Sequence, residues 1–270
     1  MPFIQANQIR LYYEWHGPEA APVLVLNNGI LMNAAASWRP QTDAFAAAYR
    51  VLQYDCRGQG QSDHPPGPYS MSQHADDLAA LLDALAVPKA HILGISYGGE
   101  VAQAFALGHR GRLASLVLAD TVSEVGPELR LIVEGWKAAA LSADADLFYL
   151  VTAPWNFSPS FIASQARVLA AARERYRSLD LPAVARLCEA FLGVDFTARL
   201  AHLDVPACII VGDRDLLKGL SYARILHGAL RGSSLQVIEG AGHAVTWEAP
   251  TAFNRAVLDF LAAVPGGCPP

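Results

Sequence analysis

The sequence predicts an α/β fold with a mostly parallel central sheet, helices on both faces of that sheet and a helical insertion. Short apolar runs alternate with stretches whose apolar residues recur at helical spacing. The runs cover residues 23–28, 50–54, 90–95, 113–119, 207–211 and 235–238. Strands that alternate with helices form parallel crossovers, and helices then cover both faces of the sheet. This alternation stops between about residues 122 and 200, which contain helical patterns but no convincing strand.

Two further apolar stretches precede these runs. Residues 3–6 and 9–15 flank an Asn-Gln turn, which predicts an antiparallel hairpin at one edge of the sheet. Helical spacing is clearest at Leu78, Leu81 and Leu82. The predicted helices cover residues 71–86, 98–108, 221–230 and 247–263, and another helical stretch separates the first two parallel strands.

The break in the alternation predicts the domain organisation. Residues 1–121 and 201–264 form the α/β core, and residues 122–200 form a helical cap. The tail, residues 265–270, reads PGGCPP and is expected to fray. Ligands of such sheets bind at the carboxyl ends of the strands, so an insertion there is expected to form a roof over the site.

Composition and charge argue against several classes of protein. The net charge is −5 and no run of Lys or Arg is present, so no nucleic-acid partner is expected. The N-terminus has no signal-peptide pattern, and no apolar segment reaches the ~18 residues of a membrane span. The four cysteines have no paired spacing, which indicates reduced thiols in a cytoplasmic protein without a metal site. No cofactor is expected, and a homo-oligomer is one alternative for the oligomeric state.

A candidate nucleophile lies between a predicted strand and a predicted helix. Residues 94–98 read Gly-Ile-Ser-Tyr-Gly, the G-x-S-x-G pattern of a nucleophile elbow. A sharp turn of this kind pushes the hydroxyl of Ser96 out above the sheet. The residues two before and two after the serine must be small, and Gly94 and Gly98 meet that requirement. The helix N-terminus also favours a negatively charged oxygen nearby.

A nucleophilic serine needs a base that an acid holds in place. His243 lies in a loop directly after the last predicted strand, and so at the carboxyl edge of the sheet. Asp215 follows the strand before it and is the favoured acid. Asp213 and Asp120 remain alternatives, because each also follows a predicted strand. The chain order of Ser96, Asp215 and His243 is the order found in α/β-hydrolases.

These motifs together resemble the α/β-hydrolase superfamily with a helical cap. The resembling segments are DCRGQGQS (55–62), GISYG (94–98), GDRD (212–215) and GAGH (240–243). The N-terminal half is most similar to 3-oxoadipate enol-lactonases, which hydrolyse a small anionic enol-lactone without a cofactor. Residues 98–102 resemble cofactor-free haloperoxidases. The Asn-Gly pair at 28–29 resembles a group of 3-hydroxyacyl-carrier-protein thioesterases and transferases.

The resemblance also implies an oxyanion hole. Its two donors are expected to be the backbone N–H groups of Tyr97 and Ile30. Gly29 is expected to turn the chain with a positive φ, so that the next N–H faces inward. Asn28 replaces a histidine of many relatives and is expected to hold this loop, and Asn28 and Gly29 are candidate substrate-binding residues. For Asn27 the alternative is a side chain that only ends the strand.

The cap is expected to supply the substrate pocket. It is rich in aromatic residues, of which Trp136 is the candidate substrate-binding residue. An anionic substrate also needs a cation, and Arg39, Arg130 and Lys137 are available in the sequence.

The predicted function is hydrolysis of a small-molecule carboxylic ester or lactone through an acyl-enzyme on Ser96. Thioester cleavage or transfer, C–C bond hydrolysis and perhydrolysis use the same triad and remain alternatives. A non-catalytic binding protein is disfavoured, because such proteins are expected to lose a triad member and all three are present.

Overall fold

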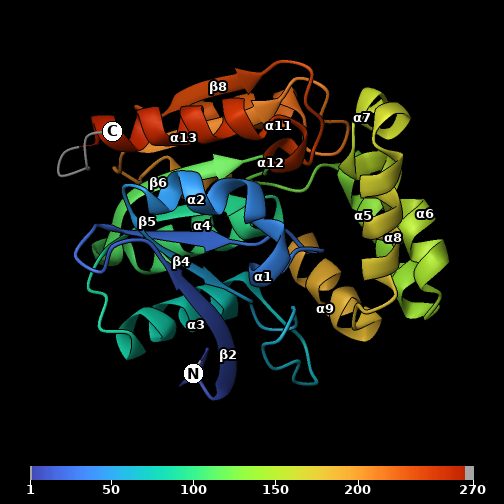
Figure 1. Cartoon of the computed structure of the whole chain (residues 1–270), viewed down its shortest axis with the longest axis horizontal. Coiled ribbons are helices and arrows are strands. Elements are labelled where there is room, and N and C mark those ends of the chain that lie inside the picture. Colours follow the sequence, from blue (N-terminus) through green and yellow to red (C-terminus); the bar gives the residue numbers. More distant parts are fainter. Residues whose placement is uncertain (1, 265–270) are drawn as a thin grey trace.

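An eight-stranded sheet forms the centre of the protein (Figure 1). The computed structural model describes residues 2–264, so the predicted frayed tail lies outside the described residues. The strands lie in the order β1-β2-β4-β3-β5-β6-β7-β8. They are β1 (Phe3–Ala6), β2 (Ile9–His16), β3 (Val23–Asn27), β4 (Arg50–Tyr54), β5 (Ala90–Ile95), β6 (Leu113–Ala119), β7 (Ala207–Gly212) and β8 (Ser234–Ile238).

The direction of the strands confirms the predicted sheet. β1 and β2 form an antiparallel edge hairpin, and β2 pairs antiparallel with β4. All further neighbours, from β4 to β8, are parallel. Parallel strands carry their carboxyl ends to one edge of the sheet, and that edge therefore collects the loops that follow β3, β5, β7 and β8.

Helices cover both faces of the sheet, as predicted. The helices are α1 (Ala34–Ser37), α2 (Arg39–Ala46), α3 (Met71–Ala84), α4 (Tyr97–Gly108), the 3₁₀ helix η1 (Arg110–Arg112), α5 (Pro127–Leu141), α6 (Ala145–Asn156), α7 (Pro159–Ser164), α8 (Ala166–Tyr176), α9 (Leu181–Leu192), α10 (Thr197–Leu200), α11 (Leu220–Ala229), α12 (Val245–Glu248) and α13 (Pro250–Ala263). The helix predicted over residues 247–263 is two helices, α12 and α13. Pro250 begins the second of them, because proline has no N–H and suits the first helical position.

Side chains that alternate along each strand build two apolar cores. In β3, Val25 packs into the core beneath α3 and α4, whereas Leu24 and Leu26 pack toward α2 and α13. In β5, Ile92 joins the first core and Leu93 joins the second. Burial on both faces explains why these strands are apolar throughout.

Helices α5–α9 lie between β6 and β7 in the chain and gather beyond one end of the sheet (Figure 1). α5 packs against α9, and α6 packs against α8. The segments that enter and leave this group meet in an isolated antiparallel bridge between Glu124 and Asp195. α10 packs against the core helices α4 and α11, so the end of the predicted cap lies beside the core. None of the helices within residues 2–264 combines the length and apolarity needed to cross a membrane.

Candidate active site

Ser96 occupies a strained turn between β5 and α4. Its φ is 52° and its ψ is −121°, a backbone conformation that residues other than glycine rarely adopt. A Cβ atom at Gly94 would lie 2.1 Å from the carbonyl oxygen of Gly98, and one at Gly98 would lie 2.2 Å from the carbonyl oxygen of Asn27. The requirement for small residues around the nucleophile therefore has a direct steric cause.

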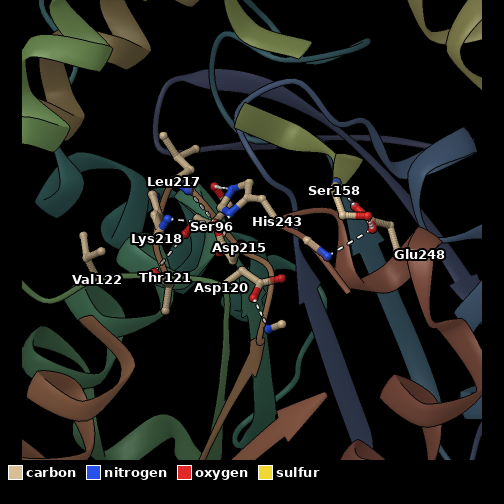
Figure 2. Close-up of polar contacts among 12 residues, drawn as sticks. Ser96, Asp120, Thr121, Val122, Ser158, Asp215, Leu217, Lys218, His243 and Glu248 are labelled. Carbon is tan, nitrogen blue, oxygen red and sulfur yellow. Dashed lines mark hydrogen bonds and ion pairs between the residues drawn. The ribbon is translucent and has the colours of Figure 1, made fainter. Parts of the chain in front are cut away.

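Ser96, His243 and Asp215 form a continuous hydrogen-bonded chain (Figure 2). Nε2 of His243 lies 2.9 Å from Oγ of Ser96, and its Nδ1 lies 2.8 Å from Oδ2 of Asp215. The three residues come from the loops after β5, β7 and β8, and all are buried. This is the geometry in which an imidazole accepts the serine proton while a carboxylate fixes its tautomer.

The structure distinguishes the three candidate acids. Oδ1 of Asp215 accepts backbone N–H bonds from Leu217 (2.8 Å) and Lys218 (2.9 Å), which leaves its other oxygen for His243. Asp213 instead accepts the N–H of Gly240 at 2.7 Å, and so connects the loop after β7 to the loop after β8.

Asp120 lies beside Asp215 (Figure 2) and accepts the N–H of Gly212 at 3.0 Å. Its Oδ2 atom is buried and has no hydrogen-bond partner among the described residues. Three possible metal-ligand atoms, one each from Asp120, Asp215 and His243, lie within 4.8 Å of one another. This spacing would suit a metal ion. Both imidazole nitrogens are engaged by Ser96 and Asp215, so a catalytic triad accounts for the arrangement.

The two neighbouring carboxyl groups have opposite pKa shifts. Burial raises the pKa of Asp120 well above its ordinary value, and the charge of Asp215 raises it further. Burial also acts to raise the pKa of Asp215, but the charge and hydrogen bond of His243 outweigh it and lower that pKa. The fold therefore favours the ionised form of Asp215, the partner of His243, and the neutral form of Asp120.

The expected oxyanion donors lie next to the nucleophile. Tyr97 is the first residue of α4, and neither its N–H nor that of Ile30 has an acceptor among the described residues. The carbonyl of Gly29 accepts bonds from Met32 N at 3.0 Å and Gln59 Nε2 at 2.9 Å, which hold the loop. The predicted positive φ at Gly29 is wrong, because these bonds form the turn without it.

Both asparagines at the end of β3 are fully buried. Asn27 donates to the carbonyl of Leu93 (3.0 Å) and accepts from the hydroxyl of Tyr54 (2.6 Å), and so connects two neighbouring strands. Asn28 donates to the carbonyl of Tyr54 (2.8 Å) and accepts from the indole of Trp38 (2.7 Å). Asn28 lines neither cavity beside Ser96, so the prediction that it contacts substrate does not fit its position.

Two cavities meet at Ser96. The main cavity has a volume of about 330 Å³, and the inner cavity has a volume of about 20 Å³. Ile30 and Ser96 line both. Gly29 lines the main cavity, as expected of a substrate-binding residue, whereas Trp136 lines only the inner one. The main cavity has a largely apolar wall that includes Ile30, Leu31, Met32, Phe157, Val168, Tyr176 and Trp247.

The cations of the main cavity are not those proposed from the sequence. Arg39, Arg130 and Lys137 do not line it, and Lys137 pairs with Glu189 elsewhere. Arg167 and Arg175 of α8 line it instead. Neither guanidinium has a hydrogen-bond or ion-pair partner within residues 2–264, and no Asp or Glu lines this cavity. The two arginines are eight residues apart, which is about two helical turns, so they lie on the same side of α8. This spacing is the sequence signal that could have identified them as a pair.

No pattern in the sequence indicated the buried ion pair that lies beside the triad. Nζ of Lys218 lies 2.9 Å and 3.0 Å from the two carboxylate oxygens of Glu100, and both residues are almost completely buried. Glu100 also accepts the N–H of Val122 at 3.1 Å. Because Lys218 follows Asp215 by three residues and Glu100 lies on α4, the pair joins the acid loop to the helix after Ser96.

Glu248 joins the cap to the loop that carries His243 (Figure 2). One carboxylate oxygen accepts the N–H of Ser158 at 2.9 Å, and the other accepts the N–H of Gly242 at 3.0 Å and the Ser158 hydroxyl. Ser158 is the N-cap of α7, and Gly242 directly precedes His243. The N–H of Ala244 also donates to the carbonyl of Asn156, at 2.9 Å.

The fold and this arrangement of residues define a hydrolase of the α/β-hydrolase class. The model of the alpha/beta hydrolase fold matches residues 22–250, and the chain belongs to this family. It is 30% identical to 3-oxoadipate enol-lactonase 2 of Acinetobacter baylyi, with 94% of each chain covered. It is 32% identical to a proposed carbamate hydrolase of Caulobacter sp. strain K31, covering 93% of this chain and 96% of that one.

A solved structure is similarly close. The enol-lactonase from Burkholderia xenovorans LB400 matches with a TM-score of 0.91 at 30% identity, covering 97% of this chain and all of the other. These relatives confirm the predicted fold, the family and the prediction that the protein is a hydrolase.

Proposed function

We propose that this protein cleaves a carboxylic ester or lactone through an acyl-enzyme on Ser96. The hydrogen-bonded chain of Ser96, His243 and Asp215 at the junction of two cavities is the observation that carries the proposal. Serine needs such a base to become a nucleophile at neutral pH. The enol-lactonase names of two relatives support an ester or lactone as the bond that is cleaved.

Each residue has one role in this reaction. Oγ of Ser96 attacks the carbonyl carbon while Nε2 of His243 takes the hydroxyl proton, and Asp215 stabilises the imidazolium. The N–H groups of Ile30 and Tyr97 donate to the oxyanion. The C–O bond then breaks, and His243 returns the proton to the leaving oxygen, which stays part of the acyl group when the substrate is a lactone. A water molecule repeats the sequence, frees the acid and restores Ser96.

The charge of the main cavity supports an apolar substrate that carries a carboxylate. Arg167 and Arg175 are the charged side chains that α8 contributes to this cavity, and none of the described acidic residues lines it. Guanidinium groups bind carboxylates with paired hydrogen bonds. An enol-lactone with a free carboxylate has these features, whereas the net charge of −5 for the whole chain does not by itself attract an anion.

Ser96→Ala tests the proposal. We expect turnover of p-nitrophenyl acetate and of lactones to fall by about 10³-fold or more, because the covalent step is lost. Ser164→Ala removes an exposed serine of α7 outside the main cavity and is the matched control. Labelling of the wild-type protein by a fluorophosphonate, absent in Ser96→Ala, identifies the nucleophile. Turnover that survives within tenfold in Ser96→Ala overturns the mechanism.

A substrate panel separates the reactions that share this triad. The panel contains esters, lactones, acyl-thioesters, a carbamate and a vinylogous diketone, each assayed with wild-type protein and Ser96→Ala. The proposal expects the highest kcat/KM among the esters and lactones. A higher kcat/KM for thioesters or for the diketone assigns the same triad to thioester cleavage or C–C bond hydrolysis instead.

We also propose a cytoplasmic location. Cys56, Cys188 and Cys208 are buried free thiols, which suits a reducing compartment. Cys268 lies outside the described residues. Fractionation of cells that produce the tagged protein tests this location.

A further inference from the structure

The inner cavity beside Ser96 offers hydrogen-bond donors. Trp136 lines it and is 3% exposed, and its indole Nε1–H is buried with no acceptor among the described residues. An unsatisfied buried N–H is costly, because it has lost its bonds to water. Such a group is therefore a candidate for a partner that the protein itself does not supply.

Lys218 is the second donor of this cavity. Its ammonium group has three N–H bonds. Glu100 accepts from this group with both carboxylate oxygens, and Nζ lies 4.3 Å from the ring centroid of Phe191. No further acceptor for Nζ exists within the described part of the chain.

The other described residues that line the inner cavity are mostly apolar. Ile30, Val133, Phe191 and Leu217 contribute apolar side chains. The hydroxyl of Tyr97 is engaged by Nε2 of His74 at 2.8 Å. The cavity therefore combines donors with an apolar wall, and its volume of about 20 Å³ suits one group of the size of a water molecule.

Its position relates this cavity to the reacting carbonyl. Ile30 and Tyr97, the expected oxyanion donors, line it together with Ser96. An atom inside it thus lies close to the acyl carbon that Ser96 would attack. A carboxylate does not suit this place, because Glu100 already balances the charge of Lys218. A neutral oxygen acceptor does suit it.

We propose that the inner cavity is a subsite for one neutral oxygen atom of the acyl group, close to the scissile carbonyl. An ether, hydroxyl or keto oxygen accepts there from the indole N–H of Trp136 and the ammonium of Lys218. The subsite selects esters of oxygen-substituted acids over esters of plain hydrocarbon acids. This inference rests on the proposed ester hydrolysis at Ser96.

Two isosteric esters test the subsite. p-Nitrophenyl methoxyacetate and p-nitrophenyl butyrate differ by one oxygen atom in place of a methylene group. The test variant is Trp136→Phe, which removes the indole N–H and keeps an aromatic ring. We expect the ratio of kcat/KM for methoxyacetate to that for butyrate to fall by about tenfold, the size of one lost hydrogen bond. Comparing ratios cancels the different intrinsic reactivity of the two esters.

Trp247→Phe is the matched control. Trp247 lines the main cavity, and its indole already donates to the carbonyl of Ser37 at 3.0 Å. Its substitution should leave the ratio unchanged. If Trp136→Phe lowers both esters equally, or changes neither, the oxygen subsite is refuted while ester hydrolysis stands. If wild-type protein hydrolyses neither ester, it is the proposed function that fails.

A binding measurement tests the subsite without turnover. The five indole N–H signals of the ¹⁵N-tryptophan-labelled Ser96→Ala protein can be resolved by NMR, and Trp136→Phe identifies the signal of Trp136. Methyl methoxyacetate should move this signal downfield, as expected for a new hydrogen bond, and methyl butyrate should not. An equal response to both esters contradicts the inference.

Discussion

The two sides of the main cavity differ in how their polar groups are held. The core wall comprises Ser96, His243 and the loop after β3. Hydrogen bonds that are buried beneath the cavity surface hold these residues in place. The cap wall comprises the α8 residues Arg167, Val168, Ala171, Ala172, Arg175 and Tyr176. Its two guanidinium groups are exposed and have no partner among the described residues. The polar groups of the core wall are thus held in place before any ligand binds, whereas the two guanidinium groups of α8 are free to reorient.

The largest expected effect comes from the buried ion pair of Lys218 and Glu100, which lies in the core beside the triad. Lys218→Met leaves Glu100 as a buried charge without its partner, and breaking such a pair typically costs about 3–5 kcal/mol. Urea unfolding measures the free energy of unfolding. The double variant Glu100→Gln with Lys218→Met removes both charges and should recover a large part of the loss. A double variant as unstable as Lys218→Met would show that the pair is not the cause.

An intermediate effect is expected from the cap wall. Substituting both Arg167 and Arg175 by Ala should raise KM about tenfold for an ester that carries a carboxylate, because the charge-assisted bonds are lost. KM for a neutral ester, kcat and the melting temperature should change little. Arg173→Ala is the matched control, since Arg173 lies on α8 but pairs with Asp146. Equal KM changes for charged and neutral esters would contradict a role in anion binding.

The smallest effect is expected from Asp120, and it depends on pH. The pKa of Asp120 is raised in the fold, chiefly by burial. Above the unfolded pKa of about 3.9, the unfolded chain releases this proton while the fold retains it, so the wild-type protein loses stability as pH rises. Asp120→Asn mimics the neutral acid and lacks this slope. Its melting temperature should therefore exceed that of wild type at pH 8 by more than at pH 4.

A constant difference between the two melting temperatures at pH 4 and pH 8 would show that the fold does not raise the pKa of Asp120. Asp213→Asn is the control for this comparison. Asp213 accepts one backbone bond from Gly240, and its side chain is partly exposed.

Much of the fold and of the triad geometry could be predicted because each signal is local. Apolar runs define the strands, and Ser96, Asp215 and His243 each follow one of them within a few residues. Parallel strands then carry these loops to the same edge of the sheet. The sequence did not, however, predict the conformation of Gly29, whose φ is not positive and whose carbonyl accepts a bond from the distant Gln59.

The remaining features depend on contacts that no local pattern encodes. Glu100 and Lys218 are 118 residues apart and each resembles an ordinary charged residue of a helix or loop. Arg175 lines the main cavity only because α8 packs on the neighbouring cap helices in one orientation. Asn28 lies in the expected loop, but its side chain bonds to Tyr54 and Trp38 inside the protein and lines neither cavity beside Ser96.

The carboxylate of Glu248 has a mechanical consequence. It accepts bonds from Ser158 at the start of α7 and from Gly242 next to His243, so the two segments share one anchor. α7 cannot lift away from the core without breaking its bonds to a carboxylate that also holds Gly242, the residue before His243. One carboxylate thus ties the position of α7 to that of the loop that carries His243.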